Sequence, residues 1–163
     1  MINKVVTGEK TRILFPSSSG GHLDEILQLK KLFANYECLI VTENVPLNRV
    51  ILKNKNYILI KPNGKNRDFV FWKNLFLNCF SALKIILKFK PDLIVTTGSH
   101  TCVPFCYIGK LLNIKVIFIL SYCRVNSRAK SADLIYPITD LFFVQWEQMK
   151  KLYQKGVYAG PLF

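Results

Sequence analysis

Short hydrophobic runs alternate along the chain with longer stretches in which apolar residues recur at helical spacing. Six runs are rich in β-branched or aromatic side chains and lack strict alternation, which is typical of strands covered on both faces. They are residues 12–15, 38–42, 57–60, 93–96, 115–120 and 141–144. The stretches of helical period are residues 23–33, 69–89, 102–112 and 146–154. This order predicts βαβ units, and hence an α/β fold with a mostly parallel sheet and helices on both faces.

The length and the net charge of the chain restrict the range of possible functions. A chain of 163 residues, half of them hydrophobic, is expected to fold as a single domain over residues 1–163 with a sizeable core. Its formal net charge of +13 indicates an anionic partner, such as nucleic acid, an anionic membrane surface or a phosphorylated ligand. We expect no nucleic acid, because neither a recognition helix nor a face with interleaved basic and aromatic residues is evident.

The cysteines and the amino-terminus favour the cytosol. The five cysteines are an odd number and lie mostly within apolar runs, so we interpret them as small core residues in a reducing compartment. The first ten residues lack the apolar core of a signal peptide. No uninterrupted apolar stretch reaches about eighteen residues, and we therefore expect that nothing spans a bilayer.

The stretch PSSSGGHLDEI places small residues and a histidine between the first strand and the first helix. Ser19, Gly20 and Gly21 allow backbone amides to approach a ligand closely, and such a loop at the carboxyl end of a parallel strand favours a phosphate or diphosphate. His22 follows directly, and is our candidate for a catalytic residue. The alternative is a plain glycine-rich turn with a solvated histidine.

A second motif, VTTGSHTCVP, stands at the end of the fourth strand. Thr97, Gly98, Ser99 and His100 should lie at the same sheet edge as the first loop. A histidine there can act as a general base or bind phosphate, although His100 has an equally plausible structural role within its loop. Two histidines without acidic companions make a poor metal site, so we expect neither a metal nor another cofactor.

The predicted helix 69–89 is apolar almost all the way round. Its charged residues and the lysine that follows it are Lys73, Lys84, Lys88 and Lys90. We interpret it as a membrane-contacting helix, with Trp72 and Phe76 in the acyl boundary and Lys73, Lys84 and Lys88 reaching lipid phosphates. Burial against a partner and a simple core role are the alternatives.

A basic segment follows the fifth strand. Arg124, Arg128 and Lys130 suit a diphosphate or a phospholipid, since arginine binds phosphate through two parallel hydrogen bonds. The alternative is a solvated basic loop.

The ordered motifs SSSGGH, PDLIVTTGSHTCVPFCYIGKLL, SYCRVNS and DLFFVQW resemble the PssD/CpsF family of bacterial exopolysaccharide glycosyltransferase subunits. That family is similar to the membrane-recruiting subunit of the eukaryotic N-acetylglucosaminyltransferase acting on dolichol diphosphate. The resemblance implies a Rossmann-like amino-terminal half of a GT-B glycosyltransferase, similar to the acceptor half of MurG. It also implies a separate donor-binding subunit, a UDP-sugar donor, a polyprenyl-diphosphate-linked acceptor and a peripheral position at the cytoplasmic face of the cell membrane.

The loops and the resemblance together give the expected site. His22 is the expected catalytic base. The expected acceptor- or phosphate-binding residues are Ser19, Gly20, Gly21, Thr97, Gly98, Ser99, His100, Ser121, Arg124, Gln145 and Trp146. Leu120 departs from the family, whose members often carry a glutamate there, and this shifts the expected catalytic burden to His22.

Two other classes of protein stay open at this stage. A free-standing nucleotide-binding enzyme would need an acidic ribose ligand, for which Glu43 is available. A non-catalytic recruitment module would bind only a membrane and a partner. In either of the subunit interpretations, the apolar tail 157–163 is expected to dock on the donor-binding subunit, since an exposed apolar tail is otherwise a liability.

Overall fold

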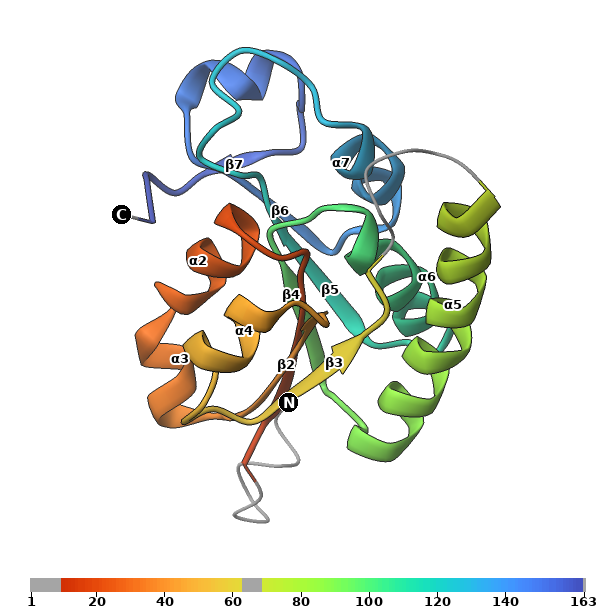
Figure 1. Ribbon diagram of the computed structural model, residues 1–163. Coiled ribbons are helices and arrows are strands. Elements are labelled where there is room, and N and C mark those ends of the chain that lie inside the picture. Colours follow the sequence, from red (N-terminus) through yellow and green to blue (C-terminus); the bar gives the residue numbers. More distant parts are fainter. Residues whose placement is uncertain (1–9, 63–68, 163) are drawn as a thin grey trace.

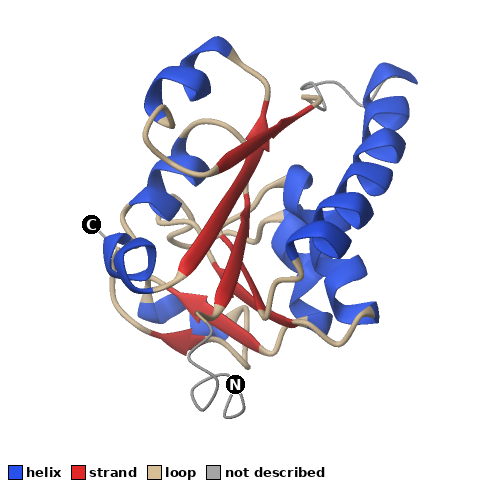
Figure 2. Ribbon diagram, turned by 90° about the horizontal axis from the view of Figure 1, so that it is seen from below, coloured by secondary structure: helices blue, strands red, loops and turns tan. Residues whose placement is uncertain are grey.

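The computed structural model describes residues 10–62 and 69–162, which form one twisted sheet of seven parallel strands between two layers of helices (Figures 1 and 2). The strands are β1 (Arg12–Pro16), β2 (Glu37–Glu43), β3 (Tyr57–Ile60), β4 (Leu93–Thr96), β5 (Lys115–Ile119), β6 (Leu141–Val144) and β7 (Val157–Tyr158). Their order is β3-β2-β1-β4-β5-β6-β7. The predicted α/β fold with a parallel sheet is therefore confirmed.

Six of the strands lie where the hydrophobic runs predicted them. Three of these match to the residue, and the others differ by one residue at one or both ends. The seventh, β7, was not predicted. It has only two residues, and its pairing of Val157 with Phe143 and Tyr158 with Val144 depends on the folded position of β6.

The helices follow the prediction less closely. They are α2 (Gly21–Leu27), α3 (Lys30–Asn35), α4 (Pro46–Ile51), α5 (Phe69–Phe89), α6 (Val103–Leu111) and α7 (Lys130–Ile135), with 3₁₀ turns at His100–Cys102, Tyr136–Ile138 and Glu147–Lys151. The single helix expected over 23–33 is wrong, because Leu29 leaves the helical region (φ −74°, ψ 45°) and separates α2 from α3. The helix expected over 146–154 is also wrong, because only a short 3₁₀ turn forms before the chain returns into β7.

Two hydrophobic clusters lie on the two faces of the sheet. Successive residues of a strand point to opposite faces, so Leu14 joins the cluster under α5 and α6, whereas Ile13 and Phe15 join the cluster on the side of α2, α3 and α4 (Figure 1). Cys102 and Cys106 are buried in the first cluster, as expected for core cysteines. Cys123 is exposed, and the core interpretation is wrong for this residue.

Helix α5 is buried on one side only. Phe71, Ala82, Ile85 and Ile86 are buried on its inner side. Its outer side carries a row of exposed apolar side chains at helical spacing, which we call the α5 stripe: Phe69, Trp72, Phe76, Phe80, Leu83 and Leu87. By length and composition this helix is apolar enough to cross a membrane, although lysine and asparagine residues interrupt its apolar run. The expectation that nothing spans a bilayer stays a prediction.

Strand order fixes where a ligand can bind. The chain runs outward from β1 through β2 to β3, then returns to place β4 on the other side of β1. In open parallel sheets, ligands bind in the crevice at the carboxyl ends of the strands where the order reverses. Here that point lies between the loops that follow β1 and β4.

Candidate functional site

The loops after β1 and β4 lie side by side at this switch point, as the sequence predicted. Ser17 forms an isolated parallel bridge with Gly98, and the amide of Ser18 donates to the carbonyl of Gly98 at 3.0 Å. The Thr96 hydroxyl donates to the Pro16 carbonyl at 2.6 Å. These bonds make one rigid edge out of two segments that are about eighty residues apart.

A cleft of about 360 Å³ opens at this edge. Six of the predicted site residues line it, namely His22, Thr97, Ser99, His100, Ser121 and Arg124. The remaining lining residues are Phe118, Leu120, Arg128, Ala129, Lys130 and Ser131. No carboxylate is among the described residues that line this cleft, and its charges come from two arginines and a lysine. The cleft therefore suits an anionic ligand.

His22 is held in place by the second loop. The Thr97 hydroxyl donates to the His22 carbonyl at 2.7 Å, and the imidazole lies against Gly98. The backbone of Gly98 has φ +116°, which strains any other residue, and an added β-carbon would also crowd His22 Cε1 at 3.1 Å.

The environment of His22 favours its neutral form. Burial lowers the pKa of its imidazole below the ordinary 6.5, and the positive charge of Arg124 acts in the same direction, while a hydrogen bond to the Thr97 backbone opposes both. Among the described residues, the buried Nδ1 atom has no hydrogen-bond partner. A neutral imidazole at a cleft is able to accept a proton near neutral pH.

The serines of the first loop do not point free donors at a ligand. The amide of Ser17 donates to the Val41 carbonyl. The amide of Ser19 donates to Glu43 Oε2 at 3.3 Å and its hydroxyl donates to Asn48 Oδ1 at 3.1 Å. Ser19 is thus engaged with the protein, and its role in ligand binding stays a prediction without a free donor to support it.

The two glycines of this loop are open to solvent. Gly20 has φ +81°, which disfavours other residues, and it precedes α2. A β-carbon at Gly21 would meet no atom within 4 Å, so the space above this residue is free for a ligand.

Hydrogen bonds of serine hydroxyl groups stabilise the second loop, which follows β4. The amide of Ser99 donates to Ser18 Oγ at 3.1 Å. Ser99 Oγ accepts from the amide of His100 at 2.6 Å and lies 3.2 Å from its Nδ1 atom. The ring of His100 also meets Phe71 of α5 edge-on, with 5.8 Å between centroids. His100 therefore has the structural role that sequence analysis left open, while one side of it lines the cleft.

Sequence analysis missed the most buried acid of the site, Glu25. Its side chain comes from α2, one turn after His22, and is 2% exposed. Glu25 Oε1 accepts from Ser121 Oγ and from the amide of Tyr122, each at 2.8 Å. Burial raises the pKa of this carboxyl above the ordinary 4.5, while the two hydrogen bonds oppose that shift. The signal in the sequence was the motif GGHLDE itself, where this acid falls on the inner face of a short helix.

The two arginines of the cleft differ in availability. Arg128 donates to Asp133 at 2.9 Å and to the Leu152 carbonyl at 2.9 Å, and its guanidinium lies 4.8 Å from the centre of the Tyr153 ring. Arg124 makes only a weak bond of 3.4 Å to Ser127 Oγ. Arg124 is therefore the better ligand for a phosphate, and Lys130 lines the same cleft from the first residue of α7.

Gln145 and Trp146 do not line the cleft. Gln145 is buried, donates to the Leu120 carbonyl at 3.0 Å and accepts from the amide of Leu162 at 2.8 Å. The indole of Trp146 donates to the Tyr122 carbonyl at 2.7 Å. Both side chains hold the segment that carries Ser121, and their direct contact with the acceptor stays a prediction.

Glu43 is already engaged within the protein. Its two carboxylate oxygens accept from the Ser19 amide and from the Thr101 hydroxyl at 2.9 Å. The free-standing nucleotide-binding enzyme needed this side chain as a ribose ligand, and the observed bonds disfavour that alternative.

Known proteins resemble this chain in sequence and in fold. A family model described as "Oligosaccharide biosynthesis protein Alg14 like" matches residues 70–162. UDP-N-acetylglucosamine transferase subunit ALG14 of Homo sapiens is 28% identical over 185 residues, covering 97% of this chain and 86% of the human protein. The protein of the same name from Candida albicans is 44% identical over 89 residues, covering 51% of this chain and 40% of its own length.

The solved structures support the fold. MurG of Acinetobacter baumannii superimposes with a TM-score of 0.70 at 15% identity, over 93% of this chain and 45% of MurG. UDP-GlcNAc 2-epimerase of Methanocaldococcus jannaschii superimposes with a TM-score of 0.68 at 13% identity, over 93% of this chain and 46% of the epimerase. The chain thus spans about half the length of these structures and has the Rossmann-like fold of the amino-terminal half of a GT-B glycosyltransferase.

Proposed function

Because the chain belongs to the Alg14-like family of oligosaccharide biosynthesis proteins, we propose that it is the acceptor-binding, membrane-associating subunit of a two-component glycosyltransferase. The partner subunit binds a UDP-sugar, and the names of the relatives favour UDP-N-acetylglucosamine. The acceptor is a saccharide linked to a polyprenyl diphosphate. The resemblance of the ordered motifs to the PssD/CpsF family supports a role of this reaction in bacterial capsule or exopolysaccharide synthesis.

The observation that carries the proposal is the cleft at the switch point, where His22 in its neutral form faces the cations Arg124 and Lys130. A sugar transfer of this kind forms a bond from the acceptor hydroxyl to the anomeric carbon and releases UDP. His22 takes the proton of the attacking hydroxyl. Arg124 and Lys130 bind the acceptor's diphosphate, and the partner's loops stabilise the departing UDP.

The α5 stripe supports a peripheral position on the cytoplasmic face of a membrane. Large apolar side chains such as Trp72 (56% exposed) and Phe76 (64% exposed) stand on the surface, with Lys73, Lys84 and Lys88 on the same helix. An apolar row flanked by lysines fits the boundary between acyl chains and anionic headgroups. Phe71, in the first turn of α5, touches His100, so the membrane-facing helix begins beside the cleft.

A second candidate function is a recruitment module without catalytic residues. One observation favours it, namely that the described residues lining the cleft include no carboxylate that could act as a base. In this case, the chain only brings the donor-binding subunit to the membrane.

Reconstitution of both subunits on vesicles with lipid-diphosphate acceptor and UDP-N-acetylglucosamine tests the proposal. We expect turnover only with both chains present. Arg124→Ala and Gly21→Val should each raise the acceptor KM about tenfold or more, since the first removes a phosphate ligand and the second fills the space above the loop. Arg49→Ala, an exposed arginine on α4, is the matched control and should change nothing.

The recruitment alternative predicts a different result. If a donor-binding subunit fused to an artificial membrane anchor turns over at the full rate without this chain, the acceptor-binding role is wrong and recruitment is right.

A further inference from the structure

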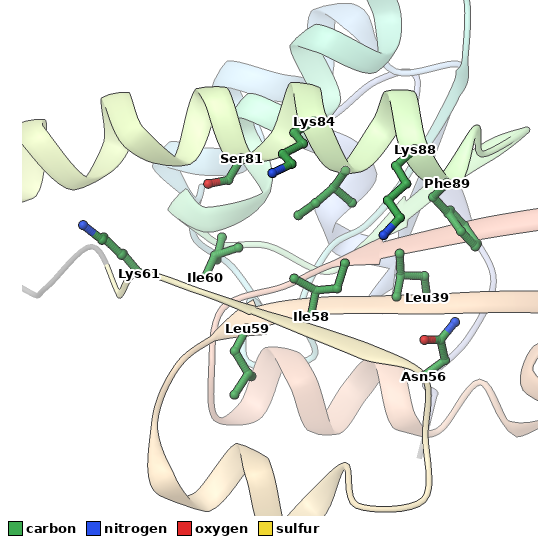
Figure 3. A pocket seen from close by; sticks show the side chains of 11 residues that line it. Leu39, Asn56, Ile58, Leu59, Ile60, Lys61, Ser81, Lys84, Lys88 and Phe89 are labelled. Carbon is green, nitrogen blue, oxygen red and sulfur yellow. The ribbon is translucent and has the colours of Figure 1, made fainter.

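A second hollow lies away from the cleft that holds His22, between α5 and the edge strand β3 (Figure 3). Its volume is about 590 Å³, which is within the usual range of small-molecule sites. We call it the β3 groove. Its lining residues come from β2, from β3 and its ends, and from the last turns of α5.

The floor of the β3 groove is apolar. Ile58 and Ile60 lie two residues apart on β3 and therefore point to the same face of the sheet, where they join Leu39 of β2. Ile85 and Phe89 of α5 line the groove from the side of the helix. Ile58 and Phe89 are only half-buried, so part of this apolar surface is open to solvent.

The rim of the groove is cationic. Lys84 and Lys88 are one turn apart on α5 and extend from the helix toward the strands (Figure 3), and Lys61 follows the end of β3. All three lysines are exposed. Among the described residues, no acid lines the groove and no ion pair involves these lysines. The complement of an apolar floor with a cationic rim is a hydrocarbon chain that carries an anionic head.

We propose that the β3 groove binds one anionic phospholipid, with its acyl chain on Leu39, Ile58 and Ile60 and its phosphate between Lys84 and Lys88. The position of these lysines supports a membrane source. Lys73, Lys84 and Lys88 are spaced by about three turns and one turn, so they form a row along α5. Lys84 and Lys88 of that row line the groove, and the row runs beside the α5 stripe. A lipid that enters the groove comes directly from the surface that the stripe contacts.

This inference goes beyond sugar transfer and does not depend on it, because lipid binding is measured on the chain alone. The probe is monomeric dihexanoyl phosphatidylglycerol, titrated below its micelle concentration in a calorimeter, with the phosphatidylcholine analogue for comparison. We expect one phosphatidylglycerol per chain and affinity about tenfold weaker, or more, for phosphatidylcholine.

Three variants locate the site. Lys84→Glu with Lys88→Glu should weaken binding about tenfold or more. Ser81→Phe should do the same without changing any charge, because Ser81 lines the groove. Among the described residues, its hydroxyl bonds only to the Leu77 carbonyl of its own helix. The matched control, Lys31→Glu with Lys150→Glu, changes two exposed lysines of α3 and of the 3₁₀ turn Glu147–Lys151. It alters the net charge equally outside the groove and should keep wild-type affinity.

Several results would overturn the proposal. Equal binding of the two lipids would show that the lysines do not discriminate between the anionic and the zwitterionic headgroup. Equal loss in the control pair would reduce the effect to general electrostatics, and wild-type affinity in the Lys84/Lys88 pair would place the lipid elsewhere. If circular dichroism shows that Ser81→Phe is unfolded, the lysine pair and its control decide alone. Trp72→Ser with Phe76→Ser, which lie on the α5 stripe, should keep binding the monomeric lipid.

Discussion

At the scale of single residues, the site depends on two side chains of one short helix. His22 faces the cleft, and Glu25 is buried behind it, where it holds the segment that begins at Ser121. Burial acts on both groups in the same way, since it disfavours the charged form of each. The neutral imidazole of His22 is therefore able to accept a proton, and the carboxyl of Glu25 holds the loop that begins at Ser121.

The first prediction concerns His22 in the two-subunit enzyme. As the base, its loss in His22→Ala or His22→Gln should lower turnover by about 10² to 10⁴. As a phosphate ligand only, its loss should chiefly raise the acceptor KM. The lowered pKa places the acid limb of the wild-type turnover profile below pH 6.5, and this limb should vanish in both variants. Turnover and KM near the wild-type values would remove every role assigned to His22.

The second prediction concerns Glu25. Glu25→Ala leaves the Ser121 hydroxyl and the Tyr122 amide without their acceptor, which should lower the free energy of unfolding by about 2 to 3 kcal/mol. Glu25→Gln keeps the accepting oxygen and should be close to wild type. Urea denaturation followed by circular dichroism measures both.

The pH dependence of the same variants has a definite sign. The pKa of Glu25 is raised on folding, so its favourable contribution is complete below about pH 4.5 and is lost as the pH rises through the raised value. Glu25→Gln lacks this loss. The stability of Glu25→Gln relative to wild type should therefore increase from pH 4 to pH 7, and a constant difference would contradict the assignment.

At the scale of elements, the sequence predicted strands better than it predicted contacts. The runs at 57–60, 93–96 and 141–144 became strands without change, because each is a run of four apolar or β-branched residues that is too short for an ordinary helix. The sequence also predicted correctly that the loops containing His22 and Ser99 lie at the same edge of the sheet. It did not reveal that Glu25 meets Ser121, or that α7 supplies Lys130 to the cleft, since such contacts depend on the packing of distant segments.

Helix α5 shows how two of the interpretations can hold together. Sequence analysis weighed a core helix against a membrane-contacting one. The structure gives it a buried side that includes Ile85 and Ile86, and an exposed side that includes Trp72 and Phe76. A helix that is apolar all round had no single polar face in its sequence, so periodicity alone was unable to separate these roles.

The third prediction concerns membrane binding through the α5 stripe. The chain should bind anionic vesicles, and binding should weaken as salt rises, because each lysine near the surface contributes about 1 kcal/mol. Trp72→Ser with Phe76→Ser should release the protein, as measured by vesicle sedimentation. Leu111→Ser, on α6 and 82% exposed, is the matched control and should stay bound. Equal binding to neutral and anionic vesicles would argue against the role of the lysines.

At the scale of the whole molecule, different sides suit different partners. The net charge of +13 includes the lysines beside the α5 stripe and the cations of the cleft, and both groups suit phosphate. At the other end of the sheet, β7 is an edge strand with Val157 and Tyr158 each 46% exposed. Beyond it, the tail returns to the sheet, where Leu162 packs beside half-buried Ile117 and Phe143 around an apolar depression of about 310 Å³.

The last prediction concerns the donor-binding subunit. Two halves of a GT-B enzyme must meet across a cleft, and the expected docking segment 157–163 lies at the sheet edge beyond β6; its last residue, Phe163, is outside the described residues. Val157→Lys with Tyr158→Lys should abolish co-purification with the partner, because charges on an edge strand prevent close apolar contact. Deletion of residues 158–163 should do the same.

Both substituted side chains are exposed, so the melting temperature of Val157→Lys with Tyr158→Lys should stay within a few degrees of wild type. Leu134→Lys with Leu111→Lys, on α7 and α6, adds the same charge elsewhere and should co-purify normally. Normal co-purification of both the substituted and the shortened chain would exclude this edge as the interface and leave the partner to dock on another face.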